Sequence, residues 1–411
     1  MQSVRARLEL QGSLLTESAE GQKTIPVHVD GQFIYDEKLL EVSKDQPIHG
    51  VRHYQLAKAK ITYRDGSLES ALREERRIVA ASVSRGVQTL FSPLGPLSHG
   101  ELELIDLPAS STLIGGWLPT KAVSVGEVWH LDGQVLATLL GLDAVNQSDL
   151  QCKLDRIEGQ LAVVHAQGNV SGAVGGVASQ MRVAAKFNVD LDRKTISWFA
   201  MSVQEKRSVG KARPGMDVTV RIQLALSPLA GSPYLDDGVL GDLTLTPDDG
   251  ATMLEFVSEA GGFEVLLNRN WHVMVDRQDV SVLRLIEQAD MLGQCNITAL
   301  PALEPGKAYS IGEFQQDVKK ALDEGFGEFT AASESLTNHG IQAMRIVATG
   351  QTADIPIQWI YYHLSSEKGQ RASCVFTCPA DLSDRFGATD EAVISSFQFR
   401  QLPAQPGNEG P

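Results

Sequence analysis

Hydrophobic and polar residues alternate with a period of two along much of the first half of the chain. In the stretches that begin at Val4, Met181 and Val218, apolar side chains occupy every second position and mostly polar side chains lie between them. This period is typical of β-strands that bury one face and expose the other to water. Because the strands are long and the turns between them are short and polar, residues 1–227 are predicted to form a large antiparallel sheet.

A single helix is predicted to interrupt this sheet, over residues 132–142. Asp132 can cap its N-terminus, and one stripe of its surface is apolar, comprising Val135, Leu136, Leu139 and Leu140. A large sheet needs an opposing layer, because apolar side chains left uncovered lose the free energy of burial. Two arrangements stay open: a closed, packed barrel, or a sheet curved around the helix with an apolar groove walled by Leu136, Leu139 and Leu140.

The alternation stops at residues 228–259, where Pro, Gly and Asp cluster without any period. This composition predicts an interdomain linker that proteases cut first. Residues 260–402 are expected to form a second, α+β domain, and residues 403–411 a disordered tail, because they are too polar to bury anything. The fold class predicted for the whole chain is therefore mainly β combined with α+β.

Two helices stand out in the second domain. The first is predicted over residues 311–324, where Ser310 and Glu313 form a capping box ahead of an apolar stripe. The second is short and lies near the end of the domain, with Thr389 as a cap and Phe397 turned toward the sheet. Several strands precede the first helix and three long strands follow it.

Two segments of the second domain are similar to a known family. They are the opening Gly262-Phe-Glu-Val-Leu-Leu-Asn-Arg-Asn-Trp271 and the closing Ala392-Val-Ile-Ser-Ser-Phe-Gln-Phe399. This domain resembles the PsbP/Mog1-like fold family over roughly residues 262–399. The resemblance implies an antiparallel sheet with a helix after the fourth strand. Members of the family are mostly non-catalytic: extrinsic photosystem subunits, a Ran-binding protein and bacterial envelope lipoproteins. The resemblance identifies no cofactor site in this chain.

One turn of the first domain is similar to segments of bacterial envelope proteins. The sequence Leu118-Pro-Thr-Lys-Ala-Val-Ser-Val-Gly-Glu-Val-Trp129 looks like a turn found in such proteins that are built on large antiparallel sheets. The domain loosely resembles the LolA/LppX-like lipoprotein carriers, in which a curved sheet wraps over a helix. The resemblance implies a lipid-like ligand beneath the sheet.

Composition and charge narrow the function classes. The chain of 411 residues is 43% hydrophobic and 21% charged, which is typical of globular domains, and its formal net charge is −15. A uniformly acidic protein repels polyanions, so nucleic-acid binding is not expected. No run of 18 apolar residues predicts a membrane span. The chain starts inside a strand pattern without the apolar segment of a signal peptide, so we expect a removed leader and export to the periplasm or cell envelope.

Neither cysteines nor histidines form a metal-binding pattern in the sequence. The four cysteines are too few for a disulfide-rich scaffold, and Cys374 and Cys378 are spaced along one predicted strand. His49 and His53 are four residues apart, but Pro47 and Gly50 argue against the helix that would bring them together. We therefore predict buried thiols, no bound metal and no cofactor.

Two groups of side chains are candidate sites. His28 and Asp30 lie two residues apart on a predicted strand and therefore on one face, as a general base and the group that orients it would. Trp359, Tyr361 and His363 also share one face of a strand, and they could form an interaction surface or simply pack in the core. The sequence fits neither the P-loop, nor the Rossmann, nor the nucleophile-elbow motif.

The leading hypothesis from the sequence is a non-enzymatic, two-domain protein of the cell envelope. Its partner would be a lipid-like ligand under the curved sheet, or a protein bound through the second domain. One alternative is a hydrolase that uses the His28 and Asp30 face. Another is an extrinsic subunit that covers a larger envelope complex. The oligomeric state is left open.

Overall fold

The computed structural model describes residues 1–18, 21–41, 48–64, 66–84, 87–210, 214–287, 290–302 and 309–400. They form two compact units, which divide between Thr252 and Met253, within the predicted linker. Both units are built mainly from antiparallel strands with few helices, so the predicted fold class is confirmed. The predicted tail at 403–411 lies outside the described residues.

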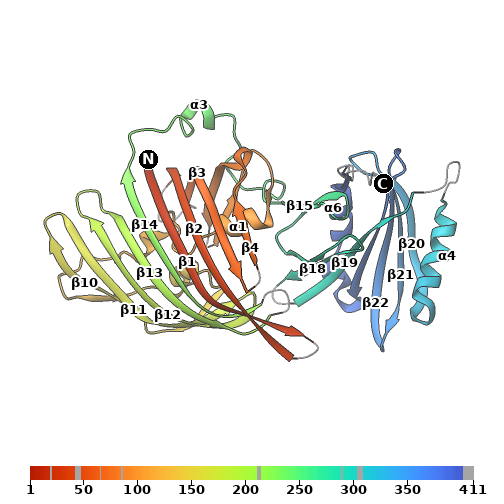
Figure 1. Cartoon of the computed structure of the whole chain (residues 1–411), viewed down its shortest axis with the longest axis horizontal. Coiled ribbons are helices and arrows are strands. Elements are labelled where there is room, and N and C mark those ends of the chain that lie inside the picture. Colours follow the sequence, from red (N-terminus) through yellow and green to blue (C-terminus); the bar gives the residue numbers. More distant parts are fainter. Residues whose placement is uncertain are drawn as a thin grey trace, which may run out of the picture. The chain divides into compact units, whose positions relative to one another are not determined.

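One antiparallel sheet of thirteen strands dominates the first unit, and its long strands curve along their length (Figure 1). The order across the sheet is β6-β5-β3-β2-β1-β14-β13-β12-β11-β10-β8, while β4 pairs with β3 and β9 with β11. The strands are β1 (Gln2–Ser18), β2 (Gly21–Glu41), β3 (Ile48–Tyr63), β4 (Gly66–Ala71), β5 (Ile78–Ser84), β6 (Val87–Phe91), β8 (Val128–His130), β9 (Ala144–Ser148), β10 (Gln151–Glu158), β11 (Leu161–Val174), β12 (Val177–Asp190), β13 (Thr195–Arg207) and β14 (Gly215–Pro228).

The first and last of these strands are neighbours. β1 pairs with β14 in a continuous ladder that runs from Gln2 opposite Pro228 to Leu15 opposite Gly215. Figure 1 shows the two strands side by side within the sheet. This ladder joins two meanders: β1 to β6, which follow on one side, and β8 to β14 on the other.

Short helices cover the apolar face of the sheet. α2 (Gly133–Leu140) contacts β9 and the 3-10 turn η2 (Ile114–Trp117), and η2 in turn contacts β13. The indole of Trp117 is fully buried between Phe187 and Phe199, with ring centroids 6.1 and 5.4 Å away. The side chain of Asp132 accepts a hydrogen bond from the backbone of Gln134, so the predicted cap is confirmed.

The prediction of a single helix in this unit is wrong. α1 (His99–Ile105) follows the short strand β7 (Leu97–Ser98), and α3 (Asp237–Leu240) follows β14; η1 (Glu74–Arg76) adds a further turn. α1 starts with a capping box between Ser98 and Glu101, a pattern visible in the sequence. The helix is only seven residues long, too short to show a clear period of 3.6.

Part of the predicted linker is packed onto the first unit. Leu235 and Leu240 are buried in a cluster with Val51 and Ile78, and the Nζ atom of Lys38 lies 2.6 Å from a carboxylate oxygen of Asp237. The Pro, Gly and Asp residues of this segment make turns, while its leucines pack in a cluster shared with β3 and β5. The chain leaves the first unit only after Thr252.

The second unit is an α+β fold around a seven-stranded antiparallel sheet of order β17-β18-β19-β23-β22-β21-β20. These strands are β17 (Trp271–Asp276), β18 (Ser281–Glu287), β19 (Asp290–Leu300), β20 (Phe326–Leu336), β21 (Gln342–Thr352), β22 (Ile355–Ser365) and β23 (Arg371–Pro379). Three further strands, β15 (Leu254–Ser258), β16 (Phe263–Leu267) and β24 (Gln398–Phe399), pair in the order β24-β16-β15.

Helices pack on both faces of this sheet. α4 (Ile311–Leu322), which begins at the predicted Ser310–Glu313 capping box and is followed by η3 (Asp323–Gly325), places Phe314 and Val318 against Met344 and Ile346. The main core on the other face includes Phe397, which is fully buried and stacks on Phe263. Near it lie η4 (Ala380–Leu382), α5 (Ser383–Phe386) and α6 (Thr389–Ser395).

Thr389 does not cap the last helix as predicted. It is already helical, and its hydroxyl donates a hydrogen bond back to the carbonyl of Phe386. Ala388 takes the cap position, where no side chain bonds the first turn.

Candidate functional site

The polar face of the first unit's sheet carries a hollow that polar side chains line. On β12, Met181, Val183 and Phe187 are buried, whereas Gln180, Arg182, Ala184 and Lys186 point to the opposite, polar face. The register places Arg182 opposite Gln204 of β13 and Asn169 of β11. Side chains that are distant in the sequence therefore meet on one rung of the ladder.

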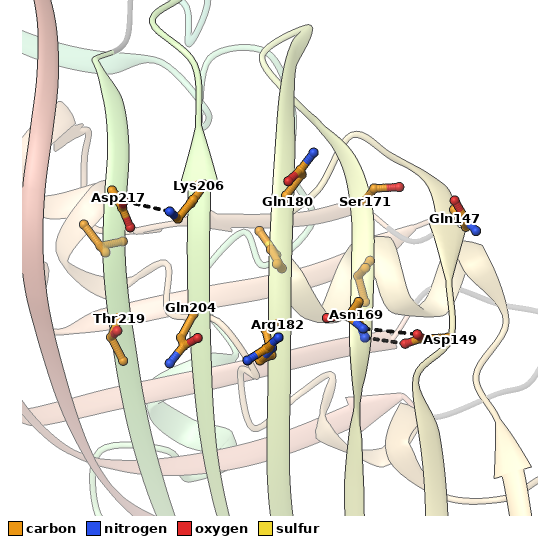
Figure 2. A pocket seen from close by; sticks show the side chains of 13 residues that line it. Gln147, Asp149, Asn169, Ser171, Gln180, Arg182, Gln204, Lys206, Asp217 and Thr219 are labelled. Atoms are coloured by element: carbon orange, nitrogen blue, oxygen red, sulfur yellow. Dashed lines mark hydrogen bonds and ion pairs between the residues drawn. The ribbon is translucent and has the colours of Figure 1, made fainter.

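This hollow has a volume of about 730 Å³ and spans β9 to β14. Figure 2 shows its amide, hydroxyl and charged side chains side by side on neighbouring strands. Those that the argument uses are Asn169, Gln180, Arg182, Gln204, Lys206 and Thr219.

Two contacts fix the rims of this hollow. The Nζ atom of Lys206 lies 3.2 Å from a carboxylate oxygen of Asp217. At the other rim, the Asn169 amide nitrogen donates to Asp149 at 3.1 Å, and the Asn169 backbone amide donates to the same carboxylate. These hydrogen bonds lower the pKa of Asp149.

Between the rims, the polar groups are free to bind a ligand. Within the described residues, no hydrogen bond or ion pair is formed by the side chains of Gln180, Arg182, Gln204 or Thr219. Amides and hydroxyls both donate and accept hydrogen bonds, and a guanidinium only donates. The hollow therefore presents a mixed set of donors and acceptors to solvent.

Two more hollows lie on the same face, one across β11 to β14 and the other across β13, β14, β1, β2 and β3. One, of about 370 Å³, is lined by His165, Ala184, Lys186, Ala200, Ser202 and Arg221. The other, of about 270 Å³, includes Arg5, Arg7, Ile34, Leu56, Trp198 and Gln223. We call the three together the polar trough. From Lys206 to Trp198 along β13, it is about 26 Å long at roughly 3.3 Å per residue.

The predicted apolar wall does not face this trough. Leu136, Leu139 and Leu140 are buried on α2, which packs against η2 and β9. In this arrangement the three leucines form core contacts. The apolar groove stays a prediction, and the hollows found on the described residues of this unit lie on the polar face of the sheet instead.

The predicted interaction surface on β22 lies beneath α4. Trp359 and His363 are buried, and Tyr361 packs against the cluster formed by Phe314 and Val318. The His363 ring lies 4.8 Å from that of Tyr309, and its Nε2 atom accepts a hydrogen bond of 2.9 Å from Arg371. Burial, followed by the charge of Arg371, lowers the pKa of His363 to about 4.

His28 and Asp30 share the polar face of β2, as predicted, but they are not joined. Asp30 pairs with Arg7 at 3.2 Å, and within the described residues neither a hydrogen bond nor an ion pair links it to His28. His53 is separated from His49 along β3 and stacks on Tyr234, with ring centroids 3.8 Å apart. The four cysteines are buried and unpaired, and burial raises the pKa of Cys378 to about 11.

Two kinds of feature would point to a metal or a membrane in the part of the chain that the structure describes: groups of metal-ligating side chains and helices that could cross a membrane. No group of three or more His, Cys, Asp or Glu side chains there could hold a metal ion. None of the helices in those residues is long and apolar enough to cross a membrane.

A second polar cluster is buried near the end of β2 and the start of β3. The Nε atom of Arg52 donates to Glu37 at 2.8 Å, and Arg52 also donates to the hydroxyl of Ser110 at 2.6 Å. Ser111 donates to Glu37 at 2.7 Å and is in hydrogen-bond contact with Tyr35. Because Arg52 and Glu37 are both buried, this cluster is closed to a ligand, and loss of either partner would leave the other charge buried without compensation.

No protein-family model and no curated protein matches the chain. Among solved structures, it is similar to a protein from Bacteroides thetaiotaomicron at 16% identity and a TM-score of 0.26, over 36% of this chain and 48% of that one. It thus spans about half the length of that protein. It is also similar to the cyanobacterial PsbP (CyanoP) from Synechocystis sp. PCC 6803, at 16% identity and a TM-score of 0.27, over 36% of this chain and 93% of that one.

The residues of the polar trough were not singled out from the sequence. Their signal was present, because the exposed positions of β12 and β13 carry Gln180, Arg182, Lys186 and Gln204. What alternation does not give is the order of strands across the sheet. Without that order, Arg182 and Gln204 are two unrelated surface residues.

Proposed function

We propose that this protein is a non-catalytic binding protein, and that its polar trough binds an elongated, hydroxyl-rich ligand such as a linear oligosaccharide. The observation that carries this proposal is the set of unpartnered amide, hydroxyl and guanidinium groups in the hollow of about 730 Å³. Sugar hydroxyls both donate and accept hydrogen bonds, so they complement such a set.

The far end of the trough suits the apolar faces of sugar rings. Trp198 lies there with Ile34 and Leu56, while Ala184 and Ala200 form a shallow floor between the two ends. An aromatic ring contributes apolar contact area with little conformational entropy to lose. The length of about 26 Å favours a chain of several sugar units over a single one.

Binding without hydrolysis is favoured by the position of the carboxylates. Glycoside hydrolysis uses two carboxyl groups about 5 to 9.5 Å apart. Asp149 and Asp217 lie on opposite rims, separated by four strand spacings from β9 to β14, or about 19 Å. Asp217 is moreover paired with Lys206.

The other functional hypotheses have weaker support. A lipid-like ligand against Leu136, Leu139 and Leu140 would need α2 to move, since these side chains are buried. A hydrolase on β2 would need His28 and Asp30 to act together, although Asp30 pairs with Arg7.

For the second unit, we propose a PsbP-like fold and a role in contacting a protein partner. The support is its order of elements, in which α4 follows the strands β16 to β19 and α6 closes the unit. A place in the cell envelope, or in a larger complex there, stays a prediction from the sequence.

Affinity electrophoresis through gels containing soluble neutral or acidic linear polysaccharides tests the binding proposal. At least one polymer should retard the protein, and the Ala200→Trp variant, which fills the floor of the trough, should lose that retardation. Ala331→Trp on the exposed strand β20 of the other unit is the matched control. The proposal is overturned if no polymer retards the protein, or if Ala200→Trp migrates like the wild type.

A further inference from the structure

We infer that the ligand of the polar trough is an acidic oligosaccharide, whose carboxylates are bound by cations on the sheet face. This inference rests on the proposed function and specifies the chemistry of its ligand. It starts from the distribution of charge between this one face and the rest of the chain.

The trough is basic although the protein is acidic. Its three hollows are lined by six cationic side chains and only two carboxylates, Asp149 and Asp217. The cations are Arg5, Arg7, Arg182, Lys186, Lys206 and Arg221. The formal charge of the whole chain is −15, so the positive charge is concentrated on this face against the overall balance. A cleft lined by one sign of charge raises the local concentration of oppositely charged ligands.

Half of these cations are already neutralised within the sheet. Arg7 pairs with Asp30 at 3.2 Å, Lys206 pairs with Asp217 at 3.2 Å, and Arg221 lies 3.6 Å from Glu9. Such pairs fix the orientation of these side chains and leave them little net charge to offer.

The other three cations have no such partner. Within the described residues, no ion pair or hydrogen bond is formed by the side chains of Arg5, Arg182 or Lys186. Arg182 and Lys186 lie four residues apart on the same face of β12, about 13 Å along the strand. Two cations at this separation along the trough suit an extended ligand that carries more than one negative group.

The neighbours of these cations distinguish an acidic sugar from other anions. Arg182 lies between Asn169 and Gln204, and Lys186 lies opposite Ala200, beside the hollow that holds Trp198. Arg182 therefore has hydrogen-bonding amides beside it, while Lys186 lies between the small Ala200 and the imidazole of His165. This arrangement can bind hydroxyls and a ring face together with a carboxylate.

Isothermal titration calorimetry on the full chain tests the inference with two probes that share one sugar backbone and differ in the charge of their carboxyl groups. They are a hexamer of galacturonic acid and the same hexamer with its carboxylates methyl-esterified. The acid should bind at least about tenfold more tightly than the ester, and added salt should lower the affinity for the acid but not for the ester. In the variant Arg182→Gln/Lys186→Gln, affinity for the acid should fall roughly tenfold more than affinity for the ester, which loses only hydrogen bonds to its hydroxyls. Lys320→Gln on α4 removes a cation outside the trough; it is the control and should leave both affinities as they are.

Three other outcomes would each overturn the inference for a different reason. If the ester binds as tightly as the acid, the charge inference is wrong while the trough remains a sugar site. If a deoxythymidine hexamer binds as tightly as the acid, the face recognises negative charge and not an acidic sugar, which also overturns the inference. If neither hexamer binds although a neutral polymer retards the protein in gels, the acidic class is excluded and the proposed function stands.

Discussion

The Nε atom of Arg52 lies 2.8 Å from a carboxylate oxygen of Glu37, and both side chains are buried between β2, β3 and the segment that contains Ser110. Taking either charge out of water is costly unless its partner is present. Arg52→Met should therefore lower the free energy of unfolding of the first unit by about 3–5 kcal/mol. The loss is measured by urea denaturation, with unfolding monitored by hydrogen exchange in peptides of β2 and β3.

Two further variants separate a buried charge from a lost contact. Replacing both residues, as Arg52→Met/Glu37→Leu, should recover part of the stability because no unpaired charge stays buried. Arg7→Met removes one partner of the exposed Arg7–Asp30 pair on β1 and β2 and should cost less than about 1 kcal/mol. Equal losses for Arg52→Met and Arg7→Met would contradict the interpretation.

A second prediction concerns the closing aromatic residue of the second unit. Phe397 is fully buried, and its ring stacks on Phe263 with centroids 5.3 Å apart. Phe397→Ala should destabilise this unit by about 3–5 kcal/mol, because it removes a large apolar side chain and leaves a cavity. Leu336→Ala, at a position that is 69% exposed, is the control and should have little effect. A loss below about 1 kcal/mol for Phe397→Ala would mean that α6 and β24 do not depend on this contact.

A third prediction is a dependence of stability on pH through His363. Burial holds its pKa at about 4 in the folded unit, against an ordinary value of 6.5. Between these two values the unfolded chain binds the proton that the folded unit excludes. Stability should therefore fall as the pH is lowered from 6.5 to 4, by up to about 3 kcal/mol, and this contribution should level off below pH 4.

Hydrogen exchange of β22 peptides, corrected for the intrinsic rate at each pH, follows this loss. In His363→Gln, the loss of protection between pH 6.5 and 4 that comes from His363 should disappear. His28→Gln, on the polar face of β2, serves as the control and should keep the wild-type slope. The assignment to His363 fails if its variant and the wild type lose protection in parallel.

A fourth prediction separates the packed part of residues 228–259 from the rest. Leu235 is fully buried with Val51 and Ile78, whereas Asp248 and Asp249 lie in an exposed turn. Limited proteolysis should cut near these aspartates before it cuts near Leu235. Leu235→Ala should make its own segment cleavable at the same protease concentration. Early cutting at Leu235 in the wild type would show that the segment does not stay docked.

Local patterns predicted the elements of the fold, since the forces that produce them act over a few residues. Met181, Val183 and Phe187 are buried exactly where alternation puts them, and the capping box of Ser310 and Glu313 starts α4. Burial of charge is not a local property. Glu37 and Arg52 lie in strands whose pattern gives no reason to bury a charge. Their buried side chains are hydrogen-bonded to Ser110 and Ser111, which lie far along the chain.

The candidate site depended on pairing that no local pattern contains. The rung that joins Asn169, Arg182, Gln204 and Thr219 exists because four strands align in one register. A shift of one residue in any of them would turn its polar side chains to the other face. Sequence reasoning identified the wet faces of the strands that contain Arg182 and Thr219. It did not predict the strand that contains Asn169, and it could not combine the strands into one surface.

The ladder between β1 and β14 also determines when the first unit can fold during synthesis. β1 emerges first and pairs with β2, but its other edge stays open until residues 215–228 have been made. An unpaired strand edge can bind the edge of another chain, and pairing between such distant segments is slow. For about 200 residues of translation, the nascent protein therefore exposes a long, unpaired strand edge. Binding of a chaperone or rapid completion of the chain would prevent aggregation through this edge.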